Sequence, residues 1–283
     1  MTTIRIGGVP EHFNLPFHLA LEEGLFERSQ LDVKWKMYPE GTGAMNRGLR
    51  TDDIDLAVIL TGGIIKDIAH GNPSKIIQMY VSSPLLWGIH VAAGSPFQKL
   101  SELENKRVAI SRYGSGSHVM AHALAKQQGW DPDQLSMVVV NTLEGAVEAL
   151  TKGKADFFMW EHFTTKPLVD QSIFRRITDF PTPWSSFVIA GREKFIADNG
   201  EALNRFLEVI NTVTEDFKRI PSIDKTLSNR YGQELEDIQK WLSMTKWSQS
   251  QITPEEINLI QKRLLALNMI DSALPAAKFV TKF

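Results

Sequence analysis

The feature that most constrains this chain is an internal repeat. Two stretches follow the same order: helix, glycine–aromatic stop, strand, glycine-containing turn, second helix, polar turn, aspartate and apolar strand. The first covers residues 21–56 and the second residues 125–157, and their last blocks are offset by 101 positions, from Leu49 to Leu150 and from Asp55 to Asp156. Any two βαβ units look alike at this level of detail, but a true repeat predicts two similar α/β lobes that face each other.

Short apolar runs alternate with helical patterns as far as about Gly191, which indicates βαβ units and mostly parallel sheets. The expected strands are Ile4–Val9, Val33–Tyr38, Ile54–Leu60, Ile76–Val81, Gly88–Ala93, Arg107–Ser111, Met137–Asn141, Ala155–Trp160 and Ser186–Ala190. The expected helices are Phe17–Arg28, Gly43–Arg50, Gly63–His70, Ser117–Gln128, Gly145–Lys152, Thr164–Asp170, Glu201–Arg219, Ser222–Tyr231, Glu234–Met244 and Pro254–Leu267. Because the last third reads as helices only, we expect it to return to the first lobe and pack there.

The predicted fold is therefore α/β, with two similar lobes around a central cleft. Lobe 1 is expected to hold residues 1–86, lobe 2 residues 87–185, and residues 186–283 to return to lobe 1 with a helical extension. The segments 84–89 and 181–187 are expected to be the crossings between lobes.

Composition narrows the class of protein. The 283 residues carry a net charge of −2, so no broad basic face for nucleic acid is expected. There is no cysteine, which rules out disulfides, cysteine-bound zinc and thiol nucleophiles. No apolar run approaches the roughly 20 residues of a membrane span, and Met1–Gly7 shows no leader pattern. The expectation is a cytoplasmic protein without membrane insertion, or a periplasmic one if a leader has been removed.

Ligands of open parallel sheets bind beyond the carboxyl ends of the strands, so the residues that follow each strand form the candidate site. Backbone amides at glycines and hydroxyls at helix starts are the groups that suit such a ligand there. In chain order these residues are Glu11, His12, Gly41, Thr42, Gly43, Thr61, Arg112, Ser115, Gly116, Ser117, Asn141, Trp160, Glu161, His162 and Trp184, with Trp87 at the first crossing.

Ser115-Gly116-Ser117 is the preferred anion site, because hydroxyls and amides at a helix start suit a carboxylate, sulfonate or phosphate. The alternative is an ordinary capped helix, and the Gly-Lys-Ser/Thr ending of a P-loop is absent. Arg112 would either bind the anion through two parallel hydrogen bonds or be a solvated residue of the loop. The aromatic side chains Trp87, Trp160 and Trp184 are candidates for the pocket walls, or for packing between lobes.

Two Glu-His pairs stand at strand ends, Glu11-His12 and Glu161-His162. They suit hydrogen bonds to a polar ligand or acid–base catalysis, and the lack of a nucleophile motif favours binding. His118 and His122 are spaced for a metal, but no third ligand is evident. We expect neither a metal nor a cofactor.

The ordered set of Pro10-Glu11-His12, Glu23–Phe26, Gly41–Gly43, Asp55–Ala57, Gly114–Ser117, Glu144–Leu150 and Gly153–Asp156 resembles the type II periplasmic-binding-protein fold. Within that fold the chain looks most like the nitrate, sulfonate and taurine binders and their thiamine-pyrimidine-synthase-like relatives, over residues 4–220. The resemblance implies a ligand in the cleft and hinge closure on binding. The synthase branch uses a cysteine-rich motif, so the missing cysteines argue against that activity.

The expected function is capture of a small organic anion by a solute-binding protein of an ABC transporter, with a membrane permease as partner if the protein is exported. The resemblance also leaves open a cytosolic enzyme similar to chorismate dehydratase, or one related to thiamine precursors. In such an enzyme Glu161 and His162, or Glu11 and His12, would be the candidate acid–base pair. A sensing module that works through a partner protein is a third alternative.

Overall fold

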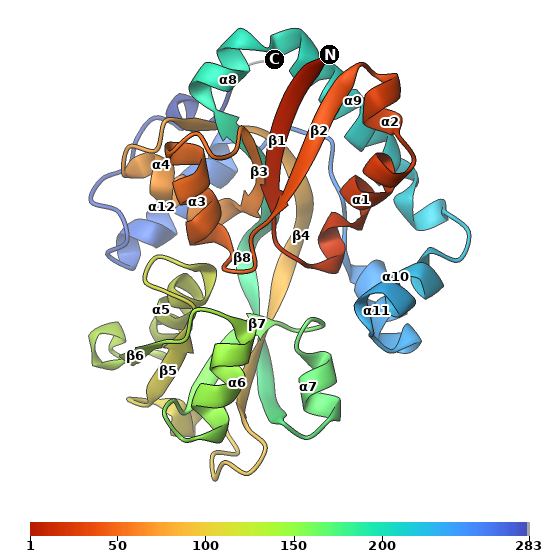
Figure 1. The fold of residues 1–283 in the computed structure, drawn as a ribbon. Helices are drawn as coiled ribbons and strands as arrows, with labels where there is room; N and C mark the ends of the chain where they lie inside the picture. The colour runs from red at the N-terminus through yellow and green to blue at the C-terminus, as the bar shows by residue number, and fades with distance from the viewer. Residues whose placement is uncertain (282–283) are drawn as a thin grey trace. The chain divides into compact units, whose positions relative to one another are not determined.

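The computed structural model describes residues 1–281, and in it the chain forms eight strands in the order β2-β1-β3-β8-β4-β7-β5-β6 (Figure 1). The strands are β1 (Thr2–Gly8), β2 (Leu31–Met37), β3 (Leu56–Leu60), β4 (Ser74–Ala92), β5 (Arg107–Ile110), β6 (Ser136–Val139), β7 (Phe157–Glu161) and β8 (Phe174–Arg192). The main helices are α1 (Leu15–Glu22), α2 (Leu25–Arg28), α3 (Thr42–Arg50), α4 (Thr61–Ala69), α5 (Gly116–Gln128), α6 (Leu143–Thr151), α7 (Lys166–Asp170), α8 (Glu193–Asp198), α9 (Gly200–Asp216), α10 (Ile223–Tyr231), α11 (Leu235–Met244) and α12 (Pro254–Ala266).

The chain divides into two compact units. Unit 1 consists of residues 1–83 and 184–283, and unit 2 consists of residues 84–183. The chain passes from one unit to the other twice, once within β4 and once within β8. Each unit is described separately below.

Unit 1 is built around β1, which pairs in parallel with β2 and β3, while β3 pairs antiparallel with β8. Figure 1 shows α3 and α4 on one side of these strands and α1 and α9 on the other. The core between β2, α1 and α9 is aromatic, with the ring of Phe17 5.3 Å from that of Trp35 and 5.9 Å from that of Phe206. The C-terminal helices belong to this unit: α12 packs on α4, and Ile76 N donates to Phe279 O at 2.6 Å.

Unit 2 repeats this arrangement. Its central strand β5 pairs in parallel with β6 and β7, and β7 pairs antiparallel with β4. The same ion pair also holds both units. Arg5 donates to Asp55 from its backbone N and Nε at 2.9 Å, and Arg107 donates to Asp156 from the same two atoms at 2.8 and 2.9 Å. The repeat predicted from sequence is therefore present in strand pairing and in side-chain contacts.

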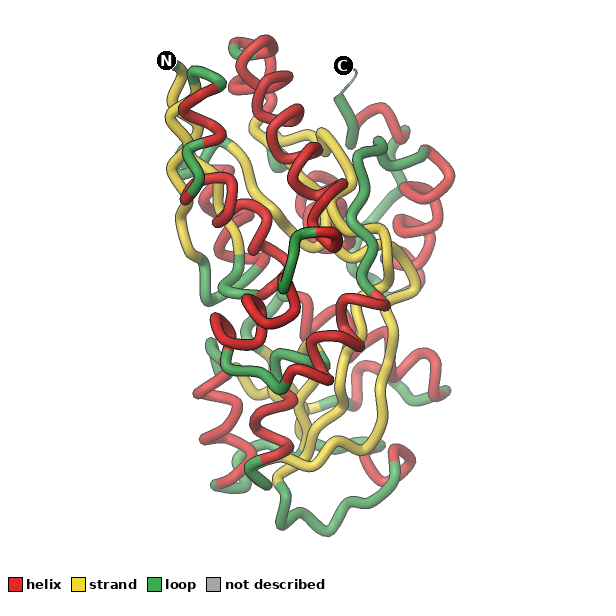
Figure 2. Tube along the Cα trace, turned by 90° about the vertical axis from the view of Figure 1, so that its right-hand side faces the viewer, coloured by secondary structure: helices red, strands yellow, loops and turns green. Residues whose placement is uncertain are grey.

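Three predicted strands were wrong in detail. The runs Ile76–Val81 and Gly88–Ala93 are one strand, β4, and Ser186–Ala190 is the end of the equally long β8; Figure 2 shows both uninterrupted. Ser-Ser-Pro at positions 82–84 is typical of a turn. Here side chains support the extended backbone: Thr182 Oγ1 accepts from Leu85 N at 2.8 Å, and Ser186 Oγ donates to Ser83 O.

The helix predicted at Phe17–Arg28 is interrupted, because Gly24 takes a left-handed φ of 66° between α1 and α2. The short helix α8 was not predicted at all. The sheet also contains antiparallel pairs, β8 with β3 and β4 with β7. Each arises because β8 or β4 enters from the other unit and runs in the opposite direction to its neighbour.

Candidate functional site

Two helices of unit 1 begin beside each other. These are α3, which starts at Thr42 after Gly41, and α4, which starts at Thr61. A Cβ on Gly63 would lie 2.4 Å from Thr42 Cγ2, so only a glycine lets these two helix starts approach so closely. A Cβ on Gly62 would lie 2.7 Å from the ring of Trp184, which places this tryptophan against the first turn of α4.

The chemistry of this place suits an anion. The first-turn amides of a helix have no partner within the helix, and the helix dipole favours negative charge there. Thr42 and Thr61 are buried, and Thr61 Oγ1 has no hydrogen-bond partner among residues 1–281. A buried hydroxyl without a partner costs free energy unless a ligand or water completes it. Of the predicted residues, Gly41, Thr42, Gly43, Thr61 and Trp184 are thus brought to one place.

His12 begins a short 3-10 helix, His12–Asn14, that follows β1, and it is enclosed by aromatic rings. Its ring centroid is 4.1 Å from that of Trp241, 5.0 Å from that of Phe13 and 5.9 Å from that of Tyr231. Burial lowers the pKa of His12 to about 3, so the imidazole is neutral at pH 7. His12 therefore offers a hydrogen bond and no charge, and its neighbour Glu11 is partly exposed.

Sequence reasoning missed Trp241 and Tyr231 as neighbours of His12, because α10 and α11 are far from it in the chain. The described atoms His12 Nε2, Tyr231 Oη and Trp241 Nε1 are all buried without a hydrogen-bond partner within residues 1–281. No local signal in the sequence points to this group.

In unit 2, the serines at the start of α5 form a closed network. Ser115 caps the helix by accepting from His118 N at 3.3 Å, and its Oγ lies 3.0 Å from that of Ser117. Ser117 Oγ also accepts from Ser111 N at 3.0 Å. These hydroxyls hold the loop in place, while the amides of the first turn, Gly116 included, give this helix start its partial positive charge. Arg112 lies half-buried in the same loop.

Glu161 and His162 both have partners inside unit 2. Arg176 Nη1 lies 2.7 Å from His162 Nε2, and since arginine only donates, Nε2 accepts and Nδ1 keeps the proton. That Nδ1–H donates to Asp179 at 2.8 Å, so both ring nitrogens are occupied. Glu161 accepts from Thr164 N at 2.6 Å, and burial raises its pKa to about 7. The pair supports the turn after β7 and does not form an open acid–base site.

The remaining predicted residues of unit 2 are dispersed. Asn141 is exposed and takes a left-handed φ of 63°, which asparagine tolerates well in a turn. Trp160 stacks on Phe158 at 5.3 Å and packs against the apolar core of the unit, while Trp87 is buried. The rings of His118 and His122 are 4.8 Å apart. Within residues 1–281 no group of three or more His, Asp or Glu side chains is placed to hold a metal.

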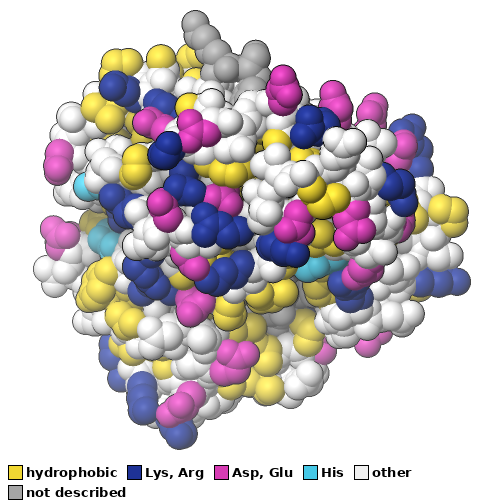
Figure 3. Space-filling view, turned by 45° about the horizontal axis from the view of Figure 1, so that its top comes forward, with side chains coloured by type: hydrophobic (Ala, Val, Ile, Leu, Met, Phe, Trp, Pro, Cys, Tyr) yellow, Lys and Arg dark blue, Asp and Glu magenta, His cyan; other side chains and the backbone are white. Residues whose placement is uncertain are grey.

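The surface and the helices bear on the class of partner. On the face shown in Figure 3, basic and acidic side chains are interspersed, in line with the net charge of −2. Across the described part of the chain, no helix combines the length and the apolar character that crossing a membrane requires.

These features define the class of protein: the chain has the type II periplasmic-binding-protein fold. A family model described as Ca3427-like PBP matches residues 87–180. The CA3427 gene product of Candida albicans, which defines a new family with the generic periplasmic binding protein fold, is 24% identical with a TM-score of 0.88, covering 98% of this chain and 93% of that one.

Two further solved structures are similar. One is the alkanesulfonate-binding protein SsuA from Xanthomonas axonopodis pv. citri, bound to MOPS, which is 16% identical with a TM-score of 0.82. The match covers 99% of this chain and 98% of the SsuA chain. The nitrate-binding protein NrtA from Synechocystis PCC 6803 is 15% identical with a TM-score of 0.71, covering 98% of this chain and 84% of its own. No curated protein matches the chain.

Proposed function

We propose that this protein is a solute-binding protein that captures a small organic anion. The observation that carries the proposal is the pair of helix starts at Thr42 and Thr61, with the buried, unpartnered Thr61 Oγ1 beside them. The amides, the hydroxyl and the flat ring of Trp184 together suit an anionic group attached to an apolar body. The similar proteins SsuA and NrtA bind alkanesulfonate and nitrate, which are both anions.

The proposal extends to unit 2 and to transport. The start of α5, with Arg112 and Ser115–Ser117, supplies a second set of positive groups, and we propose that it contacts the same ligand when hinge closure brings the units together. Glu11 and His12 are proposed to line the remainder of that site. By analogy with SsuA and NrtA, the proposed partner is an ABC permease.

The test is a calorimetric titration with MOPS, taurine, nitrate and a neutral alcohol of similar size. We expect at least one anion to bind, and Thr61→Val to weaken it about tenfold or more, because a hydrogen bond to a charged group contributes about 1.5–3 kcal/mol. Thr51→Val is the matched control, since Thr51 is exposed at the end of α3.

Closure is tested separately by small-angle scattering, which should show a smaller radius of gyration when the ligand is bound. Mass spectrometry of the ligand that co-purifies with the protein gives its identity. Equal affinity of wild type and Thr61→Val, or tight binding of the neutral alcohol alone, would refute the anion assignment.

A further inference from the structure

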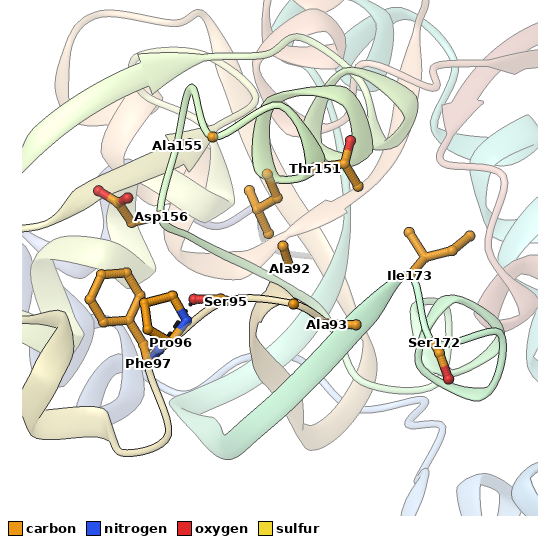
Figure 4. Close-up of a pocket in the computed structure, with 13 residues that line it drawn as sticks. Ala92, Ala93, Ser95, Pro96, Phe97, Thr151, Ala155, Asp156, Ser172 and Ile173 are labelled. Atoms are coloured by element: carbon orange, nitrogen blue, oxygen red, sulfur yellow. Dashed lines mark hydrogen bonds between the residues drawn. The ribbon is translucent and has the colours of Figure 1, made fainter.

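Unit 2 contains a pocket of about 680 Å³ that the proposed function does not use. It is lined by the end of β4, the end of α6, the turn before β7 and the segment before β8. Figure 4 shows Ala92 at its centre, with Asp156 and Phe97 on one side and Thr151 and Ile173 on the other. The volume is that of an ordinary small-molecule site.

The internal repeat tells which residues of unit 1 occupy the corresponding place. Ile6 pairs with Leu56 in unit 1 and Val108 with Phe157 in unit 2, so the residues just before these strands, Asp55 and Asp156, are equivalent.

The neighbouring strand extends the equivalence. Gly191 pairs with Leu56 in unit 1. In unit 2 the last ladder pair is His90 with Phe158, and continuing this antiparallel register by one residue sets Val91 opposite Phe157. One residue further along each strand, the counterpart of Arg192 is therefore Ala92.

In unit 1 the side chain of Arg192 fills this place. Its Nη2 donates to Asp55 Oδ1 at 2.5 Å, its Nε donates to Ile54 O at 3.1 Å, and its Nη1 pairs with Asp52. Asp55 Oδ1 also accepts from Arg5 at 2.7 Å, so this carboxylate binds two guanidinium groups at once. Only 13% of the Arg192 side chain is exposed.

In unit 2 the same positions line the pocket, and the arginine is missing. Asp156 and Ala155 take the places of Asp55 and Ile54, and Gly153 takes that of Asp52. Gly153 has a φ of 64° and Asp52 a φ of 62°, so even the backbone is equivalent. A Cβ on Gly153 would meet nothing within 4 Å.

Asp156 Oδ1 accepts from Arg107 at 2.7 Å, as Asp55 does from Arg5. The carboxylate is thus set up for two guanidinium groups, and within residues 1–281 one side chain, Arg107, donates to it.

We propose that this pocket binds an alkylguanidinium, a small molecule whose cation and aliphatic stem take the place that Arg192 fills in unit 1. Asp156 and the carbonyl of Ala155 would accept from the cation, and Ala92 and Leu150 would contact the stem. The end of α6 adds the negative pole of a helix dipole, which favours a cation.

The pocket wall is preformed. Arg175 donates to the carbonyl oxygens of Ala93 at 3.0 Å and of Ser95 and Phe97 at 2.7 Å, which holds the segment before the pocket in one conformation. Two lysines bear on the affinity. Lys106 lies 5.5 Å from the ring centroid of Phe97, and Lys154 is paired with Glu148 at 3.2 Å. Their positive charge opposes a cation at long range, so we expect the affinity to rise with salt as this repulsion is screened.

The experiment compares n-butylguanidinium with n-butylurea, which has almost the same shape and no charge, in calorimetric titrations of the full chain. We expect the guanidinium to bind about tenfold or more tightly than the urea, because a hydrogen bond to a charged group contributes about 1.5–3 kcal/mol. Ala92→Arg places a tethered guanidinium in the pocket and should abolish this binding. Tighter binding of a blocked Gly-Arg-Gly peptide would support the same chemistry and assign its source to a protein arginine.

Ala92→Met is the matched control, since it adds a stem of similar bulk without the charge. We expect the midpoint of urea-induced unfolding to be higher for Ala92→Arg than for Ala92→Met, because the new guanidinium can pair with Asp156. The proposal is overturned if n-butylurea binds as tightly as n-butylguanidinium, or if neither probe binds. It is also overturned if the Ala92→Arg variant binds n-butylguanidinium as tightly as wild type does.

Discussion

The burial of His12 makes a quantitative prediction about stability and pH. Its pKa is lowered to about 3 from 6.5 because the ring is enclosed by Phe13, Trp241 and Tyr231. Between these two values the unfolded chain binds a proton that the folded chain does not. The stability tied to this group is therefore complete at neutral pH and is lost as the pH falls below 6.5.

The size of the effect follows from the same two values. Each pH unit between them is worth about 1.4 kcal/mol, and allowing for partial titration near 6.5 the folded state should lose about 2.5 kcal/mol between pH 7 and pH 4.5 through His12 alone. His12→Phe keeps an aromatic ring in the cage and removes the titrating group. The variant should thus lose about 2.5 kcal/mol less than wild type over this range.

The assay is urea unfolding of wild type and His12→Phe at pH 7 and pH 4.5. The change in unfolding free energy between the two pH values is then compared between the two proteins. His90, which is also buried with a pKa lowered to about 3, contributes equally to both proteins and cancels. If wild type and His12→Phe lose the same stability on acidification, the argument from burial is refuted.

Three further changes test other parts of the fold. The raised pKa of Glu161, about 7, means that stability falls as the pH rises from about 4.5 through 7. Urea unfolding of Glu161→Gln should therefore show about 2.5 kcal/mol less loss than wild type between pH 5 and pH 8. Asp55→Asn should cost about 3 kcal/mol in urea unfolding and Asp156→Asn about 1, because Asp55 pairs with two guanidinium groups, one of them the buried Arg192, whereas within residues 1–281 Asp156 pairs only with the exposed Arg107; equal costs would contradict this. Gly62→Ala, whose Cβ would meet Trp184, should lose about 1–3 kcal/mol of unfolding free energy, while Gly94→Ala, with open space, should not.

Much of the fold could be predicted because local patterns and global packing agree. Each apolar run that was predicted as a strand falls on a strand of the structure, and the repeat anticipated the matching topology of the two units. Sequence patterns failed where tertiary contacts override them. Ser82-Ser83-Pro84 is extended because Thr182 and Ser186 supply the hydrogen bonds that a turn would otherwise provide.

The candidate site shows the same division. Helix starts such as Thr42 and Thr61 are readable from a glycine or a cap next to a strand. The contact of His12 with Trp241 is not readable, because it joins segments from opposite ends of the chain. The difference between Arg192 and Ala92 is visible in the sequence only once the register of β4 and β8 is known.

The division of the chain also determines the order in which its parts can be completed on the ribosome. Unit 2 is one continuous segment, so all of its residues have been synthesised once the ribosome has reached residue 183. Unit 1 is split: β3 lacks its neighbour β8 until Phe187–Gly191 is made, and Ile76 lacks its partner until Phe279 is made. One edge of β3 therefore stays unpaired until unit 2 has been synthesised, so unit 1 can be completed only after unit 2.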